Sequence, residues 1–323
     1  MAVLCAGSFV VDLVVPSLGG LGEPGSLIYA PQGIHFSTGG HAANVALSLA
    51  QMGLEEVYAA GTLGEDPLGK VFSETLRSRG VTPIPQWVEG GSTAKNIALV
   101  FQGEDRRFIA EFGTNSLLDP DHILRAIGLT RPQALYMGTL GGLPQVESRL
   151  TEILDSSKAP LKALDVIPPT QSWDFLWPAL PHADFIHLNK EEAQSLTGSS
   201  EPPAAARQLV EAGAGFAAVT GGREGVWASL GEWNIRLPAF QVGEVDATGA
   251  GDAFTAGVVL KLLEQGEAQS LQGALEALLM GQAMGAASAT QVGATAGVSP
   301  WKVARLIEGQ GERVRGGACV EEA

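Results

Sequence analysis

Basic residues and cysteines are scarce in this sequence, and both shortages narrow the choice of function. The chain has 323 residues, with 20 Lys and Arg against 35 Asp and Glu and a formal net charge of −15. So acidic a chain is poorly suited to nucleic acid or to an anionic membrane surface. Cys5 and Cys319 lie near opposite ends and have no metal-ligand spacing. We therefore expect neither a disulfide scaffold nor a zinc site.

Long apolar runs are also missing. No stretch of about 18 uncharged apolar residues occurs, so no transmembrane helix is expected. The N-terminal run MAVLCAGSFVVDLVV lacks a basic start and contains Asp12, which predicts a first strand rather than a signal peptide. We expect a cytoplasmic protein with no nucleic-acid or membrane partner.

Short apolar runs that alternate with amphipathic helical patterns are abundant. The expected strands are Val3–Phe9, Glu56–Ala60, Ala134–Met137, Lys162–Val166, Phe185–Leu188 and Phe216–Thr220. The expected helices include Ala42–Met52, Pro67–Arg79, Gln145–Asp155 and Pro203–Glu211. This alternation predicts an α/β fold with a mostly parallel central sheet and helices on both faces. The C-terminal tail GGACVEEA is expected to fray.

Two segments interrupt the alternation. Residues 13–37 are rich in Gly and Pro, and residues 88–111 have the pattern of a hairpin that turns at Gly103–Arg106. We expect both to form one small antiparallel sheet that acts as a lid over a site. A decorative edge hairpin is the alternative.

The segment Asp246-Ala-Thr-Gly-Ala-Gly-Asp252 begins an apolar helix. Backbone N–H groups at a helix start form a nest for an anion, and Gly249 and Gly251 allow close approach. Asp252 is placed to take a proton beside that anion. A base next to an anion nest suits phosphoryl transfer to a hydroxyl. An ordinary N-cap is the alternative.

Two further features favour a neutral, polar ligand. Gly39, Gly40 and Asn44 open another helix with no basic residue nearby, which suits a polyol; a plain helix entry is the alternative. Asp12 is a carboxylate within an apolar strand, and burying it unpaired is costly. We expect it at the carboxyl end of the strand, where ligands bind in open α/β sheets.

Two strand ends carry residues suited to a nucleotide. Asn189 and Glu192 share one face of a first helical turn and could order hydrated magnesium and phosphates, although a capping box explains them as well. Thr220, Gly222 and Gly225 form a turn with little side-chain bulk. A G-x-G-x-x-G fingerprint is missing at this turn and at Gly249, which disfavours a dinucleotide oxidoreductase.

Together these elements resemble the ribokinase-like (phosphofructokinase-B) carbohydrate kinase family. GGHAANVALSLAQMG resembles the first family signature, DATGAGDAFTAGVV the second, and NKEE at 189–192 the N-x-x-E element. The resemblance covers residues 3–300 and implies a single kinase domain over residues 1–323. It also implies a ribokinase-like fold with a small β lid, formed by the inserts at about 13–37 and 88–111, that serves as a homodimer interface in several members.

The resemblance also implies a role for each motif. Asp252 is similar to the catalytic base, and Gly249, Ala250 and Gly251 to the anion hole. The residues similar to the acceptor contacts are Asp12, Gly39, Gly40 and Asn44. Those similar to the phosphate and magnesium-water element are Asn189 and Glu192. Those similar to the nucleotide turn are Thr220, Gly222 and Gly225. The cofactors implied are ATP and Mg2+.

Two departures bear on substrate and cofactor. Ribokinases proper have Lys where this chain has His41, which favours a sugar other than ribose. Some relatives bind a monovalent cation such as K+ with the equivalents of Asp246 and Thr248, but Gly297 stands where a cation-binding member has Ser. Cation dependence is left open.

The resulting hypothesis is an ATP- and magnesium-dependent kinase for a primary hydroxyl of a monosaccharide or sugar acid. A nucleoside kinase of the same fold is the first alternative, and a stacking aromatic on the lid would support it. Aromatics make up 6% of the chain, and residues 13–37 and 88–111 contain no Trp, which favours a sugar. A non-catalytic sugar-binding relative is the second alternative.

Overall fold

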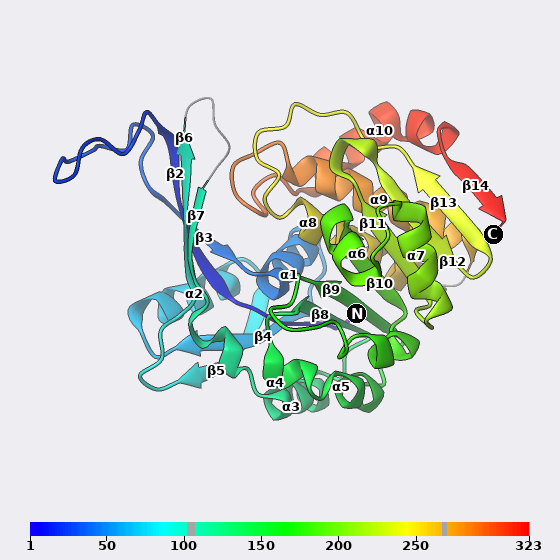
Figure 1. Cartoon of the computed structure of the whole chain (residues 1–323), viewed down its shortest axis with the longest axis horizontal. Coiled ribbons are helices and arrows are strands. Elements are labelled where there is room, and N and C mark those ends of the chain that lie inside the picture. The colour runs from blue at the N-terminus through cyan, green and yellow to red at the C-terminus, as the bar shows by residue number, and fades with distance from the viewer. Residues whose placement is uncertain (102–106, 267–269, 323) are drawn as a thin grey trace.

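A ten-stranded sheet forms the centre of the molecule (Figure 1). The computed structural model describes residues 1–101, 107–266 and 270–322. In spatial order the strands are β14 (Cys319–Glu322), β13 (Trp233–Leu237), β12 (Val226–Leu230), β11 (Phe216–Thr220), β10 (Phe185–Asn189), β9 (Leu161–Val166), β8 (Ala134–Leu140), β1 (Val3–Ala6), β4 (Val57–Gly64) and β5 (Val81–Val88). The strands from β5 to β11 in this order run parallel, and β12, β13 and β14 pair antiparallel.

Helices cover both faces of this sheet, as predicted. One face packs against α1 (His41–Gln51), α2 (Pro67–Ser78), α8 (Ala250–Gln265), α9 (Leu271–Ser288) and α10 (Pro300–Gly316). The other packs against α3 (Pro120–Thr130), α4 (Pro144–Glu147), α5 (Leu150–Ser156), α6 (Lys190–Thr197) and α7 (Pro202–Glu211). Along β1, Val3 and Cys5 join the first core while Leu4 and Ala6 join the second. The two-residue alternation thus places apolar side chains on both faces.

Local signals set the helix boundaries closely. α2 begins where the Asp66 side chain accepts the Gly69 N–H at 2.7 Å, with Pro67 in the first turn. Positive φ values of 96° at Gly53 and 83° at Gly80 follow the ends of α1 and α2.

The single helix predicted over Gln145–Asp155 is wrong, because the structure has α4 and α5 there. The Ser148 hydroxyl donates to the Gln145 carbonyl at 2.7 Å, and Arg149 leaves the helical region at φ −129°. A side chain that competes with the backbone hydrogen bonds therefore interrupts the helix.

The two interrupting segments supply a separate four-stranded sheet, called here the small sheet. Its order is β3 (His35–Gly39), β2 (Val10–Leu18), β6 (Lys95–Phe101) and β7 (Arg107–Glu111). The predicted antiparallel arrangement is wrong in one pair, because β2 and β6 run parallel. These strands come from different segments, so no hairpin turn fixes their direction. The predicted turn at Gly103–Arg106 lies outside the described residues.

The N-terminal run forms two strands rather than one. It breaks after Ala6, where a Cβ on Gly7 would lie 2.6 Å from the Gly138 carbonyl oxygen. The chain then enters the small sheet as β2, which carries Asp12. The expected position of Asp12, at the carboxyl end of a main-sheet strand, is therefore wrong.

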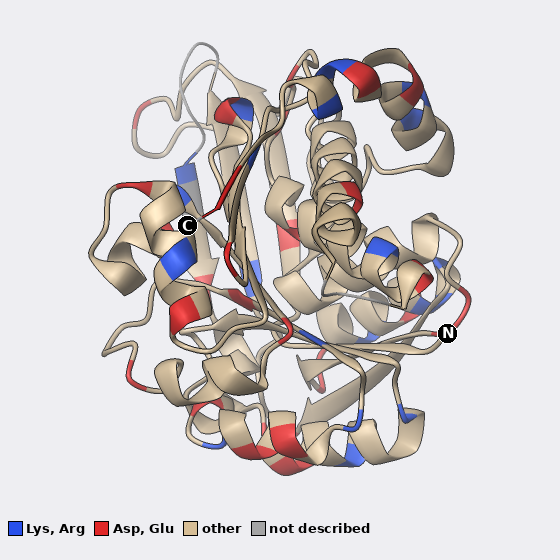
Figure 2. Ribbon diagram, turned by 90° about the vertical axis from the view of Figure 1, so that its right-hand side faces the viewer, with Lys and Arg blue, Asp and Glu red and all other residues tan. Residues whose placement is uncertain are grey.

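The C-terminal tail and the surface charges complete the fold. Residues Cys319–Glu322 pair with β13, so the expected fraying is wrong for this part of the tail. On the face opposite the small sheet, acidic and basic residues are interspersed along the ribbon (Figure 2). Among the described residues, no helix has both the length and the apolar character needed to span a membrane.

Candidate functional site

Two cavities meet at the start of α8. The sheet-side cavity, of about 380 Å³, lies against the ends of β9, β10 and β11 and the helices α8 and α9. The small-sheet cavity, of about 760 Å³, lies between the small sheet and the main body. The residues that line both are His41, Gly249 and Asp252. A group bound at this junction is within reach of molecules in both cavities.

Asp252 lies in the first turn of α8 and is 8% exposed. Its Oδ2 accepts a hydrogen bond from Asn44 Nδ2 at 2.8 Å, which links α8 to α1. Burial raises the pKa of Asp252 above its usual value, and the Asn44 bond acts in the opposite direction. The carboxylate is thus held in one orientation and has an increased affinity for a proton.

The helix start beside Asp252, where an anion nest is predicted, has no side-chain cap. Gly249 caps α8 at φ 73°, and any Cβ there would overlap the Ala294 backbone. The Ala250 N–H donates to Ala247 at 3.1 Å. The N–H groups of Gly251 and Asp252 belong to the first turn, where no intrahelical acceptor exists. Gly249, Ala250 and Gly251 all line the sheet-side cavity.

Asp12 faces the small-sheet cavity from β2, across from Asp252. Asn96 Nδ2 donates to its Oδ1 at 3.1 Å. Burial raises the pKa of Asp12 to about 6, and the Asp252 charge acts in the same direction while the Asn96 bond opposes it. A Cβ on Gly39 would overlap Asp12 Oδ2, so Gly39 makes room for this carboxylate. Gly40 lines the cavity and has φ 89°.

Asn44 lines the small-sheet cavity, but its amide nitrogen is bonded to Asp252. Its Oδ1 is buried and has no hydrogen-bond partner among the described residues. In this structure Asn44, which is expected to contact the acceptor, therefore orients Asp252, the candidate base. Sequence position alone gives no sign of this pairing, because the two residues are 208 positions apart.

Asn189 and Glu192 form a capping box. The Glu192 N–H donates to Asn189 Oδ1, and the Asn189 N–H donates to Glu192 Oε2, both at 2.8 Å. Both side chains also line the sheet-side cavity. Burial raises the pKa of Glu192. Asn189 and Glu192 can therefore cap α6 and also contact a ligand in the cavity. The capping box holds the Glu192 carboxylate in place.

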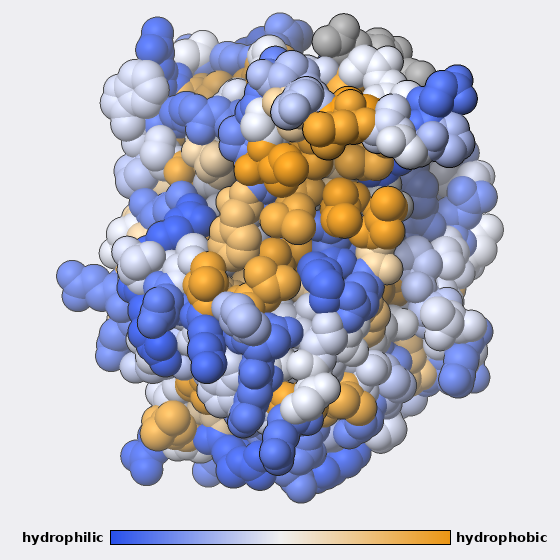
Figure 3. Space-filling model, turned by 90° about the vertical axis from the view of Figure 1, so that its left-hand side faces the viewer, coloured by the Kyte–Doolittle hydropathy of each residue, from blue (hydrophilic) through white to orange (hydrophobic). Residues whose placement is uncertain are grey.

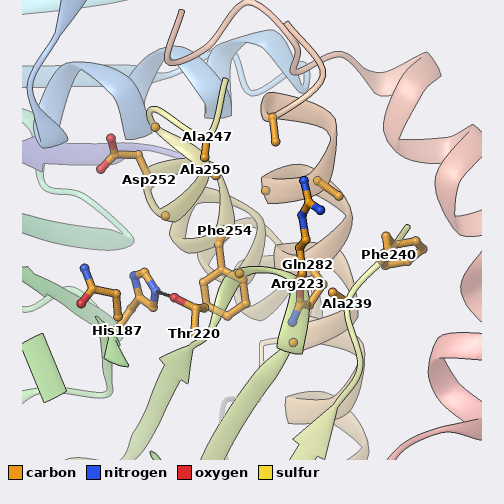
Figure 4. A pocket seen from close by; sticks show the side chains of 18 of the residues that line it. His187, Thr220, Arg223, Ala239, Phe240, Ala247, Ala250, Asp252, Phe254 and Gln282 are labelled. Carbon is orange, nitrogen blue, oxygen red and sulfur yellow. Dashed lines mark hydrogen bonds between the residues drawn. The ribbon is translucent and has the colours of Figure 1, made fainter. Parts of the chain in front are cut away.

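The turn after β11 forms another wall of the sheet-side cavity. Thr220, Gly222 and Gly225 all line it. Gly222 has φ 56° and Gly225 φ 100°, and a Cβ on Gly225 would overlap the Leu237 carbonyl oxygen. Gly222 is exposed, whereas Gly225 is buried and allows the turn to pack closely against Leu237. Figure 4 shows Phe240 and Ala239 on a wall away from Asp252.

A buried polar cluster beneath this cavity was missed by sequence reasoning. His187 bonds through Nδ1 to Asp165 and through Nε2 to Thr220, both at 3.0 Å, and the second bond is visible in Figure 4. Asp165 also accepts from Tyr136 at 2.8 Å and from Thr255 at 3.0 Å. Burial lowers the pKa of His187, but the Asp165 carboxylate outweighs burial and raises it overall. The sequence signal that could have indicated this cluster is the presence of polar residues near the carboxyl ends of β9 and β10.

Asp246 and Thr248 form hydrogen bonds in the turn before α8, and Asp246 also bonds to the loop after α9. Asp246 Oδ1 accepts from the Thr248 N–H at 2.9 Å and from its hydroxyl at 2.7 Å. Asp246 Oδ2 accepts the Gly293 N–H at 3.0 Å. These bonds connect the turn before α8 to the loop after α9.

An α/β protein in which two cavities meet at one buried carboxylate is arranged as an enzyme that passes a group between two bound molecules. This chain belongs to the pfkB family of carbohydrate kinases, whose family model matches residues 2–302. Its class is therefore that of phosphotransferases with an alcohol acceptor, as predicted.

Known proteins agree with this assignment. A fructokinase of Klebsiella pneumoniae is 28% identical over 303 residues, covering 89% of this chain and 93% of the relative. A ribokinase structure from Giardia lamblia gives a TM-score of 0.81 at 18% identity, covering 95% of this chain and 98% of that one. The structure of a fructokinase with bound ATP from Xylella fastidiosa gives 0.78 at 22% identity, covering 96% and 99%. The predicted ribokinase-like fold is confirmed.

Proposed function

We propose that this chain transfers the γ-phosphoryl group of ATP to a primary hydroxyl of a monosaccharide or sugar acid, with Asp252 as the general base. The observation that carries the proposal is the position of Asp252, which lines both cavities at the start of α8. ATP binds in the sheet-side cavity and the acceptor in the small-sheet cavity. The whole chain acts as one kinase domain.

On the donor side, the turn at Thr220, Gly222 and Gly225 offers backbone to the nucleotide. The solved fructokinase that resembles this chain binds ATP, as its description states. Mg2+ prefers oxygen ligands and keeps several waters. Glu192 fits such a hydrated ion, because its carboxylate lines the cavity and is oriented by Asn189. When bound, Mg2+ neutralises charge on the phosphates.

On the acceptor side, Asp12 and Asn96 offer a carboxylate and an amide to sugar hydroxyls. Gly40 allows the chain to approach the ring. The fructokinase relative makes fructose the first acceptor to test.

In the transfer step, Asp252 accepts the proton of the attacking hydroxyl, whose oxygen forms the new bond to phosphorus. The N–H groups at the start of α8 stabilise the charge on the phosphoryl oxygens. The affinity for a proton that burial gives Asp252 suits a base. Asn44 bonds to Oδ2 and keeps the carboxylate in place.

The small sheet is proposed as a lid, and its outer face as a homodimer interface. Register places Phe36, Leu13, Ile97 and Ile109 in one row across β3, β2, β6 and β7. Phe36 is 40% and Ile109 60% exposed. Figure 3 views this side of the molecule and shows an extended apolar patch. A second copy would cover it, and sedimentation velocity tests this.

A monovalent cation is the remaining cofactor that the family resemblance leaves open. Asp246 accepts hydrogen bonds from Thr248 and from the Gly293 N–H. Rates in KCl and in tetramethylammonium chloride at equal ionic strength test a requirement for K+. Equal rates would rule it out.

A nucleoside kinase is the second candidate, and one observation favours it. Phe112 lines the small-sheet cavity and is 43% exposed, so its ring is available to stack on a base. The deciding experiment is an ADP-release screen over hexoses, pentoses, sugar acids and nucleosides, with the Asp252→Asn variant as control. Release with none of these acceptors would contradict the proposed function.

A further inference from the structure

We infer that His41 takes part in the transfer itself, by donating a hydrogen bond from Nε2 to the phosphoryl group as it passes between the cavities. The inference rests on the proposed function. His41 begins α1 and lines both cavities, as Asp252 and Gly249 do. One of its ring nitrogens lies within 4.8 Å of a carboxylate oxygen of both Asp252 and Asp165. The ring is therefore at the point of transfer.

A strained residue holds this ring. Thr139 is β-branched yet has φ 62°, a left-handed conformation that such residues rarely adopt. Its N–H donates to His41 Nδ1 at 3.2 Å, and its hydroxyl bonds to that of Ser8 at 2.6 Å. Strain of this kind persists only where the surrounding structure imposes it, and it occurs often at functional sites. Here its visible result is one fixed orientation of the imidazole.

The Thr139 bond also determines where the proton is. Nδ1 accepts an N–H, so the neutral ring carries its proton on Nε2. Within the described part of the chain, no acceptor is recorded for this Nε2–H. The nearby carboxylates already have other donors: Asn44 for Asp252, and Tyr136 and Thr255 for Asp165. The N–H remains available to a ligand at the junction.

Phosphoryl transfer requires a hydrogen-bond donor from His41 and no proton transfer beyond the one to Asp252. The acceptor oxygen bonds to the γ-phosphorus, the bond from phosphorus to the bridging oxygen of ADP breaks, and the hydroxyl proton goes to Asp252. His41 keeps its own proton. Its N–H adds to the α8 N–H groups, at a position where two carboxylates would otherwise repel the phosphoryl oxygens.

A matched pair of variants tests this role. His41→Leu keeps much of the bulk but has no donor, whereas His41→Gln supplies an amide N–H. We expect His41→Leu to lower kcat about 100-fold, with both KM values within about threefold. His41→Gln should keep kcat within about tenfold of the wild type. His182→Gln, at a half-buried histidine that is paired with Asp155 and lines neither cavity, serves as the control and should match the wild type.

A second measurement distinguishes a direct contact of His41 with the phosphoryl group from a role of its ring in packing. ADP, aluminium fluoride and the acceptor together imitate the group in transfer. His41→Leu should weaken this complex about 100-fold while leaving ATP affinity nearly unchanged. Equal losses of kcat in the two variants, with raised KM values, would mean a packing role and overturn the inference. Wild-type kcat in His41→Leu would overturn it too. His41→Ala takes the place of His41→Leu if the latter does not fold.

The proposed function fails in a different way. If Asp252→Asn keeps the wild-type rate, the base assignment is wrong whatever His41 does. If Asp252→Asn is inactive while His41→Leu is normal, only the His41 inference falls.

Discussion

The two cavities are built differently. The sheet-side cavity is enclosed by one body, because strand ends, α8 and α9 all belong to the ten-stranded sheet and its helices. Beneath it, His187 links Asp165 of β9 to Thr220 of β11 through two hydrogen bonds of 3.0 Å. The small-sheet cavity spans two bodies, with Asp12 and Asn96 on the small sheet and Asp252 on the main one.

A few tethers join the two bodies. Asn115, fully buried, accepts the Phe9 N–H at 3.1 Å and donates to the Phe9 carbonyl at 3.0 Å where the chain enters β2. Asp66 accepts the N–H and the hydroxyl of Thr93, at 2.7 and 2.8 Å, just before β6. Under the proposed function, one body forms the donor site, and the acceptor site lies between the two bodies.

Asp252→Asn should have the largest effect, because Asp252 belongs to both cavities. The amide cannot take the hydroxyl proton, so kcat should fall by about 10² to 10⁴. ATP affinity, measured by calorimetry, should change less than about threefold, since the sheet-side cavity keeps its other walls. More than about a tenth of the wild-type kcat would contradict the base assignment.

Asp12→Ala should affect the two cavities differently, because Asp12 lines only the small-sheet cavity. Hydrogen bonds to a charged group contribute about 1.5 to 3 kcal/mol each. Loss of one such bond should raise the acceptor KM roughly 10- to 100-fold while the ATP KM stays nearly constant. Parallel rises in both KM values would mean that Asp12 is structural.

The pKa of Asp12 adds a pH test of the same residue. Its carboxylate is protonated below about pH 6, and a protonated group is a weaker acceptor for sugar hydroxyls. The kcat/KM for the acceptor should therefore fall as pH drops through about 6. Asp12→Asn should lose this limb of the profile. A profile unchanged by Asp12→Asn would assign the limb to another group.

Local patterns predicted much of the fold and the motif positions. The caps and glycines that bound α1 and α2 act within a few residues, and the alternation of strands with helices predicted the parallel sheet. The path of the chain after Gly7 depends on close approach to Gly138, which is 131 residues away and has no local signal. The direction of β6 beside β2 likewise depends on how two separate segments meet.

The site was predictable where one motif supplies its geometry. The α8 start is such a case, because Gly249, Gly251 and Asp252 are consecutive or nearly so. The partners of these groups come from distant strands and helices. Asn44 reaches Asp252 only after α1 packs on α8, and the Asp165–His187 pair forms only when β9 lies beside β10. The five histidines are scattered along the sequence, yet His41 and His187 both line the sheet-side cavity.

Asn115→Ala should weaken the connection between the bodies. It leaves the Phe9 N–H and carbonyl without their partner, which costs about 1 to 3 kcal/mol of unfolding free energy. A loosened small sheet excludes water less well, so ATP hydrolysis should rise several-fold relative to sugar phosphorylation. The measurement is the ratio of ADP to sugar phosphate formed. Ser172→Ala, whose exposed hydroxyl bonds only within its own loop, is the control. An unchanged ratio in Asn115→Ala would speak against a lid.

Phe112→Ala should have the smallest effect and should sharpen the acceptor class. Among the described residues that line the small-sheet cavity, Phe112 is the only Phe, Tyr or Trp. Stacking on a base contributes about 0.5 to 1.5 kcal/mol, so kcat/KM for nucleosides should fall about two- to tenfold. A sugar ring relies on Asp12 and Asn96 and should lose less than about twofold. For the wild type we expect the best sugar or sugar acid to exceed the best nucleoside by at least about tenfold in kcat/KM. A wild-type preference for adenosine, inosine or cytidine, lost in Phe112→Ala, would reverse the acceptor class and leave the roles of Asp252 and the sheet-side cavity unchanged.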